Sequence, residues 1–443
     1  MFFLPQLLFL AALLIGSAYV VAAPVSWHGA TEVARGPGEK GAWQQNDSRY
    51  RYVDDPAVTI DSLGNVSIAW ADQSRKSIFF QRYAANGHAQ LAQPVNVSGN
   101  PDTFSWLPRL VQAPDVPARI YVLWQEIIFS GGSHGGDMLF SRSDNYGRSF
   151  TRPINLSRSK AGAGKGRINA GVWDNGSFDL VAGPNGALYV AWTEYEGRLW
   201  LARSNDGGNR FSPPLLISGG ENQKPARAPS LALGQDGRVY LAWTQGEDDG
   251  ADIHLAHSGD EGNSFSAPAR IASSARYADA PKLAAGPPGS VHLTYAQSEG
   301  GPFARYRIVY TRSNDGARSF KLPRAISHPL PGSAESARYP SLEVDEANRV
   351  YVSYELYPDV RSGSRGLGLS VSPDGGNTFS SPVVVPDSAS ADGGINGSQQ
   401  GKLMNKLAVN RHGRFVIANS SLLQDEQSRV WLIHGAIAGT TRR

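Results

Sequence analysis

The sequence predicts an all-β protein folded as a β-propeller, a ring of four-stranded antiparallel blades, and three observations support this fold class. The composition, with 49 Gly, 28 Pro, 17 Tyr and 10 Trp among 443 residues, is typical of strands and tight turns rather than helices. An apolar strand–turn–strand pattern recurs along the chain, and a shorter motif follows most of its copies. Internal repeats of this kind indicate a repeat architecture.

The strand–turn–strand pattern is clearest in "PSLALGQDGRVYLAWTQ" (229–245), where a strand, a glycine-bearing turn and a second strand rich in Val, Tyr and Trp follow one another. The steps between successive copies include 52, 52 and 59 residues, and a unit of this length leaves room for the four antiparallel strands of one blade. Seven copies favour seven blades, and six would result if an end copy were not a full blade. The copies occupy residues 56–72, 108–126, 178–194, 229–245, 281–297, 340–356 and 406–421.

The two ends of the repeat array are less regular than its middle. The first copy is followed by a degenerate turn at 83–90, and the last copy (406–421) lacks a clear fourth strand. Residues 25–35, "VSWHGATEVAR", could supply that strand and so close the ring. The N-terminal segment is therefore a candidate for the closing strand of the propeller.

The shorter motif has the form Ser-x-Asp-x-Gly-x-x-Phe and is expected at the turn between the third and fourth strands. Its Asp can accept backbone N–H groups inside a hairpin, its Gly permits positive φ, and we expect its Phe to anchor the turn in the hydrophobic layer of its blade. Asn145 replaces Asp in the first copy and Ala317 replaces Gly in the fourth. Five repeats favour a structural turn over a catalytic loop. The copies are Ser143–Phe150, Ser204–Phe211, Ser258–Phe265, Ser313–Phe320 and Ser372–Phe379.

This motif, at the same turn of successive blades, resembles the Asp-box (BNR) repeats of the sialidase (neuraminidase) superfamily. The resemblance covers residues 50–435. It implies a sialidase-like propeller but says little about the reaction, because proteins with such blades include sialidases, other glycosidases and non-catalytic binding proteins.

Antiparallel strands determine the face on which function is expected. The turn between strands three and four lies on the same face as the turn between strands one and two. The loops between strands two and three, and between blades, lie on the opposite face. In the sialidases that this chain resembles, that opposite face holds the substrate.

Arginine recurs just before the first strand of three successive blades, as Arg227, Arg276 and Arg338. Three such side chains could converge on one anion, because the guanidinium group suits bidentate carboxylate binding. The resemblance implies an arginine triad that binds the carboxylate of sialic acid, and "RAPSL" and "RYPSL" resemble the family's Arg-Ile-Pro segment. The alternative is that these arginines pair with acidic neighbours across blades.

The first blade departs from the family pattern. It reads Asp54-Asp55-Pro56 where the Arg-Ile-Pro segment is expected. Arg51 lies close by but out of register, and it is a fourth candidate for substrate binding.

A polar residue follows the aromatic residue that closes the second strand of most blades. Three of its acidic members, Asp72, Glu126 and Glu194, are candidate catalytic residues, because glycosidases generally use a pair of carboxyl groups. The alternative is that they only solvate loop ends. The same position holds Gln245, Gln297 and Glu355 in other blades.

Tyrosine offers a second route, because sialidases use a Tyr nucleophile assisted by Glu together with an Asp acid/base. Tyr339 and Tyr357 are expected on the same face and are candidate catalytic residues. The alternative is that they pack between blades. The first hypothesis is therefore a sialidase-like glycoside hydrolase acting on acidic glycans, and the second is a non-catalytic propeller that binds a glycan or an envelope protein.

No cofactor or metal is expected, and the absence of Cys excludes thiolate metal ligands. The net charge of +3, with both signs interspersed, makes nucleic acid an unexpected partner. Residues 1–22 are apolar and end in small residues, which predicts a signal peptide or a retained N-terminal membrane anchor. We expect an exported bacterial protein, periplasmic or secreted, in which residues 23–443 form a single propeller domain.

Overall fold

The structure is a computed structural model that describes residues 25–44, 46–127, 136–159, 166–169, 172–174, 177–220, 222–272, 276–390, 393–397 and 405–437. The predicted signal peptide or anchor, residues 1–22, lies outside the described residues. Within them, η1 (Pro184–Gly186) is a single short 3-10 turn, and no helix has the length and apolar character needed to cross a bilayer.

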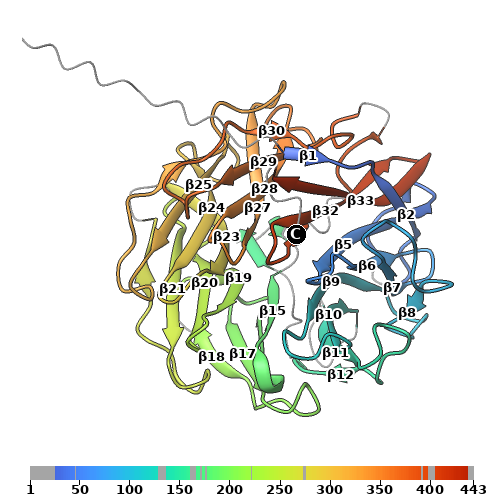
Figure 1. Ribbon diagram of the computed structural model, residues 1–443, viewed down its shortest axis with the longest axis horizontal. Helices are drawn as coiled ribbons and strands as arrows, with labels where there is room; N and C mark the ends of the chain where they lie inside the picture. The colour runs from blue at the N-terminus through green and yellow to red at the C-terminus, as the bar shows by residue number, and fades with distance from the viewer. Residues whose placement is uncertain are drawn as a thin grey trace, which may run out of the picture.

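The described strands form seven blades arranged in a ring, as Figure 1 shows in a view along the ring axis. The all-β propeller predicted from the repeat is therefore confirmed, with seven blades rather than six. The first strands of neighbouring blades contact one another around the axis. Two short hairpins lie outside the blades, β3 (Glu39–Lys40) with β4 (Tyr50–Arg51), and β13 (Gly166–Asn169) with β14 (Val172–Asp174).

Blades 1 to 3 are consecutive four-stranded meanders. Their strands are β5 (Val53–Ile60), β6 (Val66–Asp72), β7 (Ser77–Tyr83) and β8 (Val95–Asn96); β9 (Ser105–Gln112), β10 (Ile120–Glu126), β11 (Asp137–Ser143) and β12 (Ile154–Asn155); and β15 (Phe178–Ala182), β16 (Leu188–Thr193), β17 (Leu199–Ser204) and β18 (Leu215–Ser218).

Blades 4 to 6 repeat the same order. Their strands are β19 (Ala226–Leu233), β20 (Val239–Gln245), β21 (Asp252–Ser258) and β22 (Ala269–Arg270); β23 (Tyr277–Ala285), β24 (Val291–Ser298), β25 (Arg307–Ser313) and β26 (Arg324–Ala325); and β27 (Ser336–Val344), β28 (Val350–Tyr357), β29 (Leu367–Ser372) and β30 (Val383–Val384).

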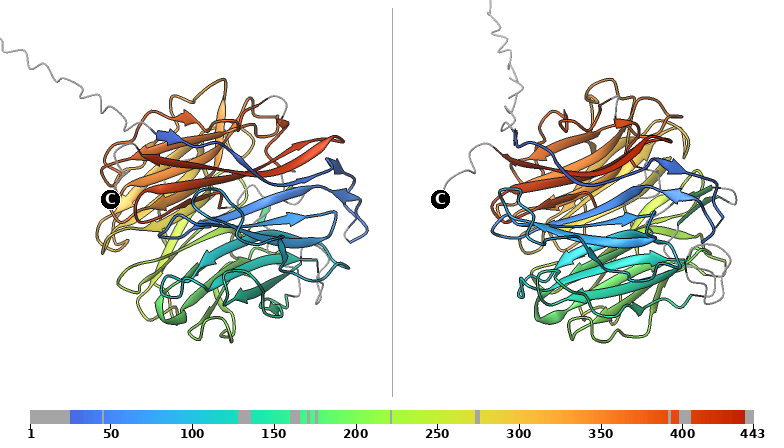
Figure 2. Two further views of the ribbon diagram at one scale, coloured as in Figure 1. Left: turned by 45° about the vertical axis from the view of Figure 1, so that its right-hand side comes forward. Right: turned by 90° about the vertical axis from the view of Figure 1, so that its right-hand side faces the viewer.

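Blade 7 is built from both ends of the chain. It combines β31 (Leu407–Val409), β32 (Arg414–Leu423) and β33 (Gln427–Ile437) with the N-terminal strands β1 (Val25–Trp27) and β2 (Thr31–Gly36), which both pair antiparallel with β33. Figure 2 shows the blue N-terminal strands lying beside the red C-terminal ones. The prediction that residues 25–35 close the ring is confirmed.

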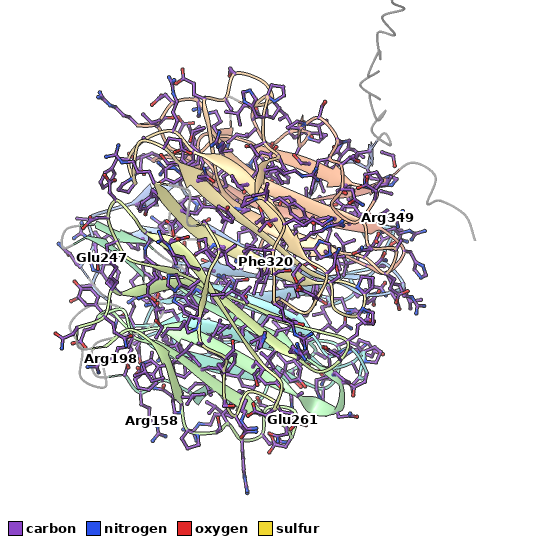
Figure 3. The ribbon with its side chains drawn as sticks, turned by 90° about the vertical axis from the view of Figure 1, so that its left-hand side faces the viewer. Arg158, Arg198, Glu247, Glu261, Phe320 and Arg349 are labelled. Carbon is purple, nitrogen blue, oxygen red and sulfur yellow. The ribbon has the colours of Figure 1, made fainter. Side chains whose placement is uncertain are left out.

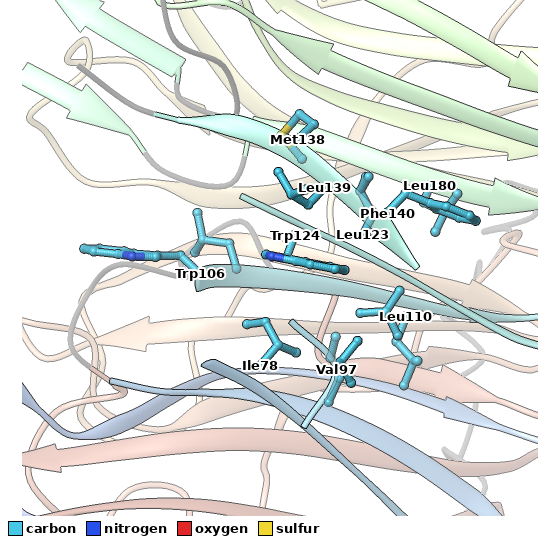
Figure 4. Packing of buried hydrophobic residues seen from close by; sticks show 14 of the residues in the cluster. Ile78, Val97, Trp106, Leu110, Leu123, Trp124, Met138, Leu139, Phe140 and Leu180 are labelled. Carbon is cyan, nitrogen blue, oxygen red and sulfur yellow. The ribbon is translucent and has the colours of Figure 1, made fainter. Parts of the chain in front are cut away.

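The inner strands are buried on both faces because each blade is packed between two others. In β20 (VYLAWTQ) only the last residue is partly exposed, as expected for a sheet covered on both sides. Figure 4 shows part of the resulting core, where Ile78 of blade 1, Trp124 of blade 2 and Leu180 of blade 3 belong to one buried cluster. Tertiary packing between blades therefore provides the hydrophobic core.

The repeated motif forms a compact hairpin held by its own side chains. In the third copy, the Ser258 hydroxyl donates to Asp260 Oδ1 at 2.7 Å and accepts the Gly262 N–H at 2.8 Å. Asp260 Oδ1 also accepts the Ser264 N–H at 2.9 Å. Hydrogen bonds from the Ser264 and Ser258 side chains hold the pKa of Asp260 well below its usual range. The predicted structural role of the motif agrees with this geometry.

The motif also fastens each of blades 2 to 6 to the blade before it. A Cβ on Gly147 (φ 82°) would lie 1.9 Å from the Phe80 ring of blade 1, so only glycine lets that ring approach. The motif phenylalanines pack on rings of the preceding blade, not only in the layer of their own blade as expected. The ring centroids are 5.3 Å apart for Phe150–Phe80, 4.9 Å for Phe211–Phe140 and 4.8 Å for Phe379–Tyr310.

The two sets of loops lie on opposite faces of the ring. In Figure 3, Arg198 and Glu247, from loops between strands two and three, lie at the left, whereas Glu261, at the lower edge, lies further to the right and Arg349 lies at the right. Glu261 belongs to a copy of the motif and Arg349 to a turn between strands one and two. We call the left side the loop face and the right side the motif face. The prediction that the turns between strands one and two and between strands three and four lie on one face, and the loops between strands two and three on the other, is confirmed.

A chain that begins at Pro37, and so lacks β1 and β2, is expected to unfold at a temperature several degrees lower and to aggregate more readily. The reason is that removal exposes the outer edge of β33, an eleven-residue strand. Thermal unfolding and light scattering measure both effects. An unchanged melting temperature would show that β1 and β2 do not close the ring.

Candidate functional site

The first strands of five blades share a local irregularity near the loop face. In each of these blades the pairing with the second strand shifts register at a proline, and a non-glycine residue with positive φ precedes that proline. Proline cannot donate a ladder hydrogen bond, which favours a β-bulge at this position, and bulges re-aim side chains. The positive-φ residues are Asp55, Leu107, Ala228, Ala280 and Tyr339.

The bulges bring side chains from separate blades together at the axis. Ala228 of blade 4, Ala280 of blade 5, and Tyr339 and Tyr357 of blade 6 form one buried cluster. The guanidinium carbon of Arg338 lies 5.5 Å from the centre of the Tyr357 ring. Of the predicted site residues, the structure therefore brings together Arg338, Tyr339 and Tyr357.

Arg227 is held inside the protein by a carboxylate of the next blade. Its side chain is 1% exposed, and Nη1 donates to Asp279 Oδ1 at 2.6 Å while Nη2 donates to the Tyr277 hydroxyl at 2.6 Å. Thr244 Oγ1 donates to the same carboxylate oxygen at 2.9 Å. The guanidinium group assigned to a substrate carboxylate on sequence grounds thus binds a carboxylate of the protein itself.

The other two members of the predicted triad also contact the neighbouring blade. Arg276 is exposed and pairs with Asp249 of blade 4 at 2.5 Å. Arg338 donates to the Ala304 carbonyl of blade 5 at 3.1 Å, and its guanidinium carbon lies 4.0 Å above the Tyr306 ring. The described contacts do not gather the three arginines around one anion; they match the alternative of pairing across blades.

The predicted acids of blades 1 to 3 make contacts away from this cluster. Glu126 is buried and accepts hydrogen bonds from Trp124 Nε1 at 2.9 Å and Asn100 Nδ2 at 3.0 Å. Burial raises the pKa of both Asp72 and Glu194, against the opposing effects of nearby arginines. The described hydrogen bonds and ion pairs of these three acids do not include Tyr339 or Tyr357.

Arg51 lies on the hairpin formed by β3 and β4. It is exposed and pairs with Glu39 of the same hairpin at 3.2 Å. The described contacts do not place it in the axial cluster.

Asp54 and Asp55 are the residues that sequence reasoning passed over. Both are almost completely buried, and the Ser420 hydroxyl of blade 7 donates to Asp54. Asp55 Oδ2 accepts the Leu107 N–H at 3.3 Å, whereas Oδ1 has no hydrogen-bond partner among the described residues. Burial, followed by the charge of Asp54, raises the pKa of Asp55 well above its usual value, and Lys406 opposes this shift.

A second carboxyl group, Glu355, lies close to the same lysine. Glu355 is 2% exposed and stands opposite Arg338 in the β27–β28 register. Lys406 Nζ lies 2.7 Å from Glu355 Oε1 and 2.9 Å from Asn419 Oδ1, whereas Glu355 Oε2 has no partner among the described residues. Glu355 belongs to the predicted set of polar residues after a closing aromatic, which is the signal that could have found it.

We define the axial site as Asp55, Arg338, Tyr339, Glu355, Tyr357 and Lys406. It contains two buried carboxyl groups: Glu355 is paired with Lys406, and the pKa of Asp55 is raised although the charge of Lys406 opposes the shift. This arrangement can supply a proton donor, a carboxylate and aromatic surfaces in one place. Within the described part of the chain, no group of three or more His, Cys, Asp or Glu side chains is placed to hold a metal ion.

Further charges line a cavity of about 230 Å³ along the axis. Lys282 and Glu343 line it together with Asp179, which lies 3.7 Å from Arg109. Burial lowers the pKa of Lys282 to about 8 and raises the pKa of Glu343 to about 7. The inner strands therefore carry charges of both signs around this cavity.

Comparisons of the whole chain with known proteins identify similar structures. No protein-family model and no curated protein sequence matches the chain. A protein of unknown function from Dyadobacter fermentans DSM 18053 is 15% identical with a TM-score of 0.51, over 77% of this chain and 97% of that chain. The polysaccharide lyase Uly1 is 12% identical with a TM-score of 0.51, over 93% and 99%. The Hadza microbial sialidase Hz136 is 16% identical with a TM-score of 0.47, over 83% and 73%. At these identities the first two similarities show a shared fold.

The Arg227→Ala variant is expected to lose about 3–5 kcal/mol of unfolding free energy, because it leaves the buried carboxylate of Asp279 without its partner. The matched variant Arg276→Ala removes an exposed pair and is expected to change stability by less than about 1 kcal/mol. Denaturant unfolding of both variants measures the difference. Equal losses would contradict the structural role of Arg227.

Stability is expected to fall as pH rises from about 5 to about 7, because folded Glu343, with its raised pKa, binds a proton that the unfolded chain has released. The Glu343→Gln variant removes this contribution, so its melting temperature should decline less over the same range. Thermal unfolding at several pH values checks this, with Glu346→Gln in the nearby exposed turn as the control. Parallel curves for wild type and Glu343→Gln would contradict it.

Proposed function

We propose that the protein is a glycan-active propeller that hydrolyses a glycosidic bond at the axial site. The observation that carries this proposal is the pair of buried carboxyl groups, Asp55 and Glu355, beside Lys406. Glycoside hydrolysis uses two carboxyl groups in different protonation states, one to donate a proton and one to act as base or nucleophile.

Asp55 fits the role of proton donor. Its raised pKa keeps the carboxyl group protonated to a higher pH than an exposed aspartate, and Oδ1 has no partner in the described structure. A group of this kind can protonate the leaving oxygen of a glycosidic bond. The Leu107 N–H bond to Oδ2 orients the carboxyl group.

Glu355 fits the role of the second carboxylate. Lys406 supplies its counter-charge at Oε1, and Oε2 is left for the sugar or for an attacking water. Sialidases, which this chain resembles, use a tyrosine assisted by Glu as the nucleophile. Tyr357 lies two residues after Glu355 on β28 and is the candidate for that role here.

The side chains around the two carboxyl groups indicate the class of substrate. Tyr339 and Tyr357 offer aromatic surfaces on which a sugar ring can stack, and Arg338 offers one guanidinium group for an acidic or hydroxyl-rich sugar. Because Arg227 and Arg276 already bind protein carboxylates, we propose a site that does not depend on a full triad and accepts substrates beyond sialosides. The polysaccharide lyase Uly1 has the same fold, and this similarity supports the proposal that the substrate is a glycan.

A non-catalytic propeller that binds a glycan or an envelope protein is the second candidate. The pairing of all three predicted arginines with neighbouring blades favours it, because side chains used to join blades are not available to a substrate. Both candidates assign the protein to the bacterial periplasm or exterior, a proposal that rests on residues 1–22.

The deciding experiment is hydrolysis of a panel of fluorogenic glycosides, with sialosides, uronides and neutral sugars, by the purified protein. We expect turnover of at least one substrate and a loss of about 100-fold or more in Asp55→Asn and in Glu355→Gln, because each variant removes one proton-transfer group. Asparagine retains the oxygen that accepts the Leu107 N–H, so Asp55→Asn should remain folded.

The matched control is Glu299→Gln, an exposed carboxylate paired with Arg307 on the loop face, which should keep wild-type turnover. A pH profile adds a second test, since activity should fall at alkaline pH as Asp55 loses its proton. Turnover that survives both axial substitutions would place the chemistry elsewhere. No turnover of any glycoside, combined with binding of one, would favour the non-catalytic propeller.

A further inference from the structure

The seam between blades 7 and 1 is not fastened by a copy of the repeated motif. In blades 2 to 6 the repeated motif receives an aromatic ring, and often an arginine, from the preceding blade; Arg142, for example, donates to the Gly207 carbonyl at 2.6 Å. Blade 1 has no copy of the motif. Its third strand is followed instead by the tight turn "AANGHAQ" (84–90), closed by the Gly87 N–H to the Ala84 carbonyl at 2.8 Å.

A cavity of about 480 Å³ occupies this seam on the motif face. Four parts of the chain line it: the N-terminal segment that closes the ring, the end of β5 with the turn after it, the irregular turn of blade 1, and the strands β32 and β33 of blade 7. Their polar side chains are His28, Thr31, Asn86, Arg414 and His434.

The polar lining of this cavity is cationic. Arg414 is exposed, and its Nη1 lies 3.4 Å from the position of a Cβ on Gly64, so glycine leaves the guanidinium group room beside the turn. None of the described residues that line the cavity is acidic. An anion would therefore meet attraction from Arg414 and no carboxylate to repel it.

His434 provides a second observation that points to a ligand. Its Nε2 is buried and has no hydrogen-bond partner among the described residues. Burial, and then the proximity of His28, lowers the pKa of His434. A buried polar nitrogen without a partner costs free energy, which a bound acceptor or donor would recover.

The remaining lining suits an organic molecule rather than a bare ion. Ile60, Ala85, Phe415 and Ala436 contribute apolar surface, and the cavity falls within the range of small-molecule sites, about 300–1,000 Å³. An inorganic anion would leave most of this surface unoccupied.

We propose that the seam cavity binds a small organic carboxylate of about monosaccharide size. Arg414 and His434 hold the carboxylate, and Phe415 and Ile60 contact the carbon skeleton. The site is independent of the proposed glycan chemistry because it lies on the opposite face of the ring. A ligand here contacts the first blade, the last blade and the closing segment together, so its binding stabilises the closed ring by mass action.

The probe for this proposal is D-glucuronate, with D-glucose as a neutral molecule of the same size and inorganic phosphate as a bare anion, all at equal ionic strength. Thermal unfolding and titration calorimetry on the full chain are the measurements. We expect glucuronate to raise the melting temperature and glucose and phosphate to have little effect. Arg414→Gln should weaken glucuronate binding by about tenfold or more, because it removes a charge-assisted bond.

Two variants separate this site from other causes. Arg411→Gln removes an exposed arginine of the neighbouring turn that does not line the cavity, and it should bind glucuronate as the wild type does. Glu355→Gln disables the axial site and should also leave the response intact. Overturning results are an equal response to glucose or phosphate, no response at all, or a response kept by Arg414→Gln. A response lost only in Glu355→Gln would place the ligand at the axial site, overturning this proposal and leaving the proposed function standing.

Discussion

Pairing of the two chain ends on β33 is the constraint on which the rest of the structure depends. Each blade presents two apolar faces, and both are buried only when a blade lies on either side. In an open array the end blades would each expose one such face. Pairing of β1 and β2 with β33 turns the array into a ring, so that blade 7 covers blade 1.

Closure of the ring also brings the first strands of the blades together at one axis, where the residues of the axial site lie. Seven first strands that would otherwise follow one another in a row instead face a common centre, and bulges in five of them re-aim side chains there. This arrangement buries charged side chains, and several of them lie in ion pairs between blades. Arg227 with Asp279 illustrates the result, because a side chain well suited to bind a substrate serves to join two blades.

The sequence identified part of the axial site. Arg338, Tyr339 and Tyr357 were predicted from their place at the loop face, and they lie together because blade order and strand direction alone determine that face. Asp55 and Glu355 were not among the chosen catalytic residues. Asp54-Asp55-Pro56 occupies the same bulge as the arginine-bearing segments of other blades, yet only the ring shows that its carboxyl groups lie near Lys406 of the last blade.

By itself the sequence determined the fold class and the two faces, favoured seven blades over six and indicated a candidate closing strand, because each depends on local periodicity and on the alternation of antiparallel strands. Tertiary structure alone decided which charges meet. Arg227 and Asp279 are 52 positions apart, and Glu355 and Lys406 are 51 apart. Whether an arginine meets a substrate or a neighbouring carboxylate depends on inter-blade distances of a few ångströms, which no pattern along the chain encodes.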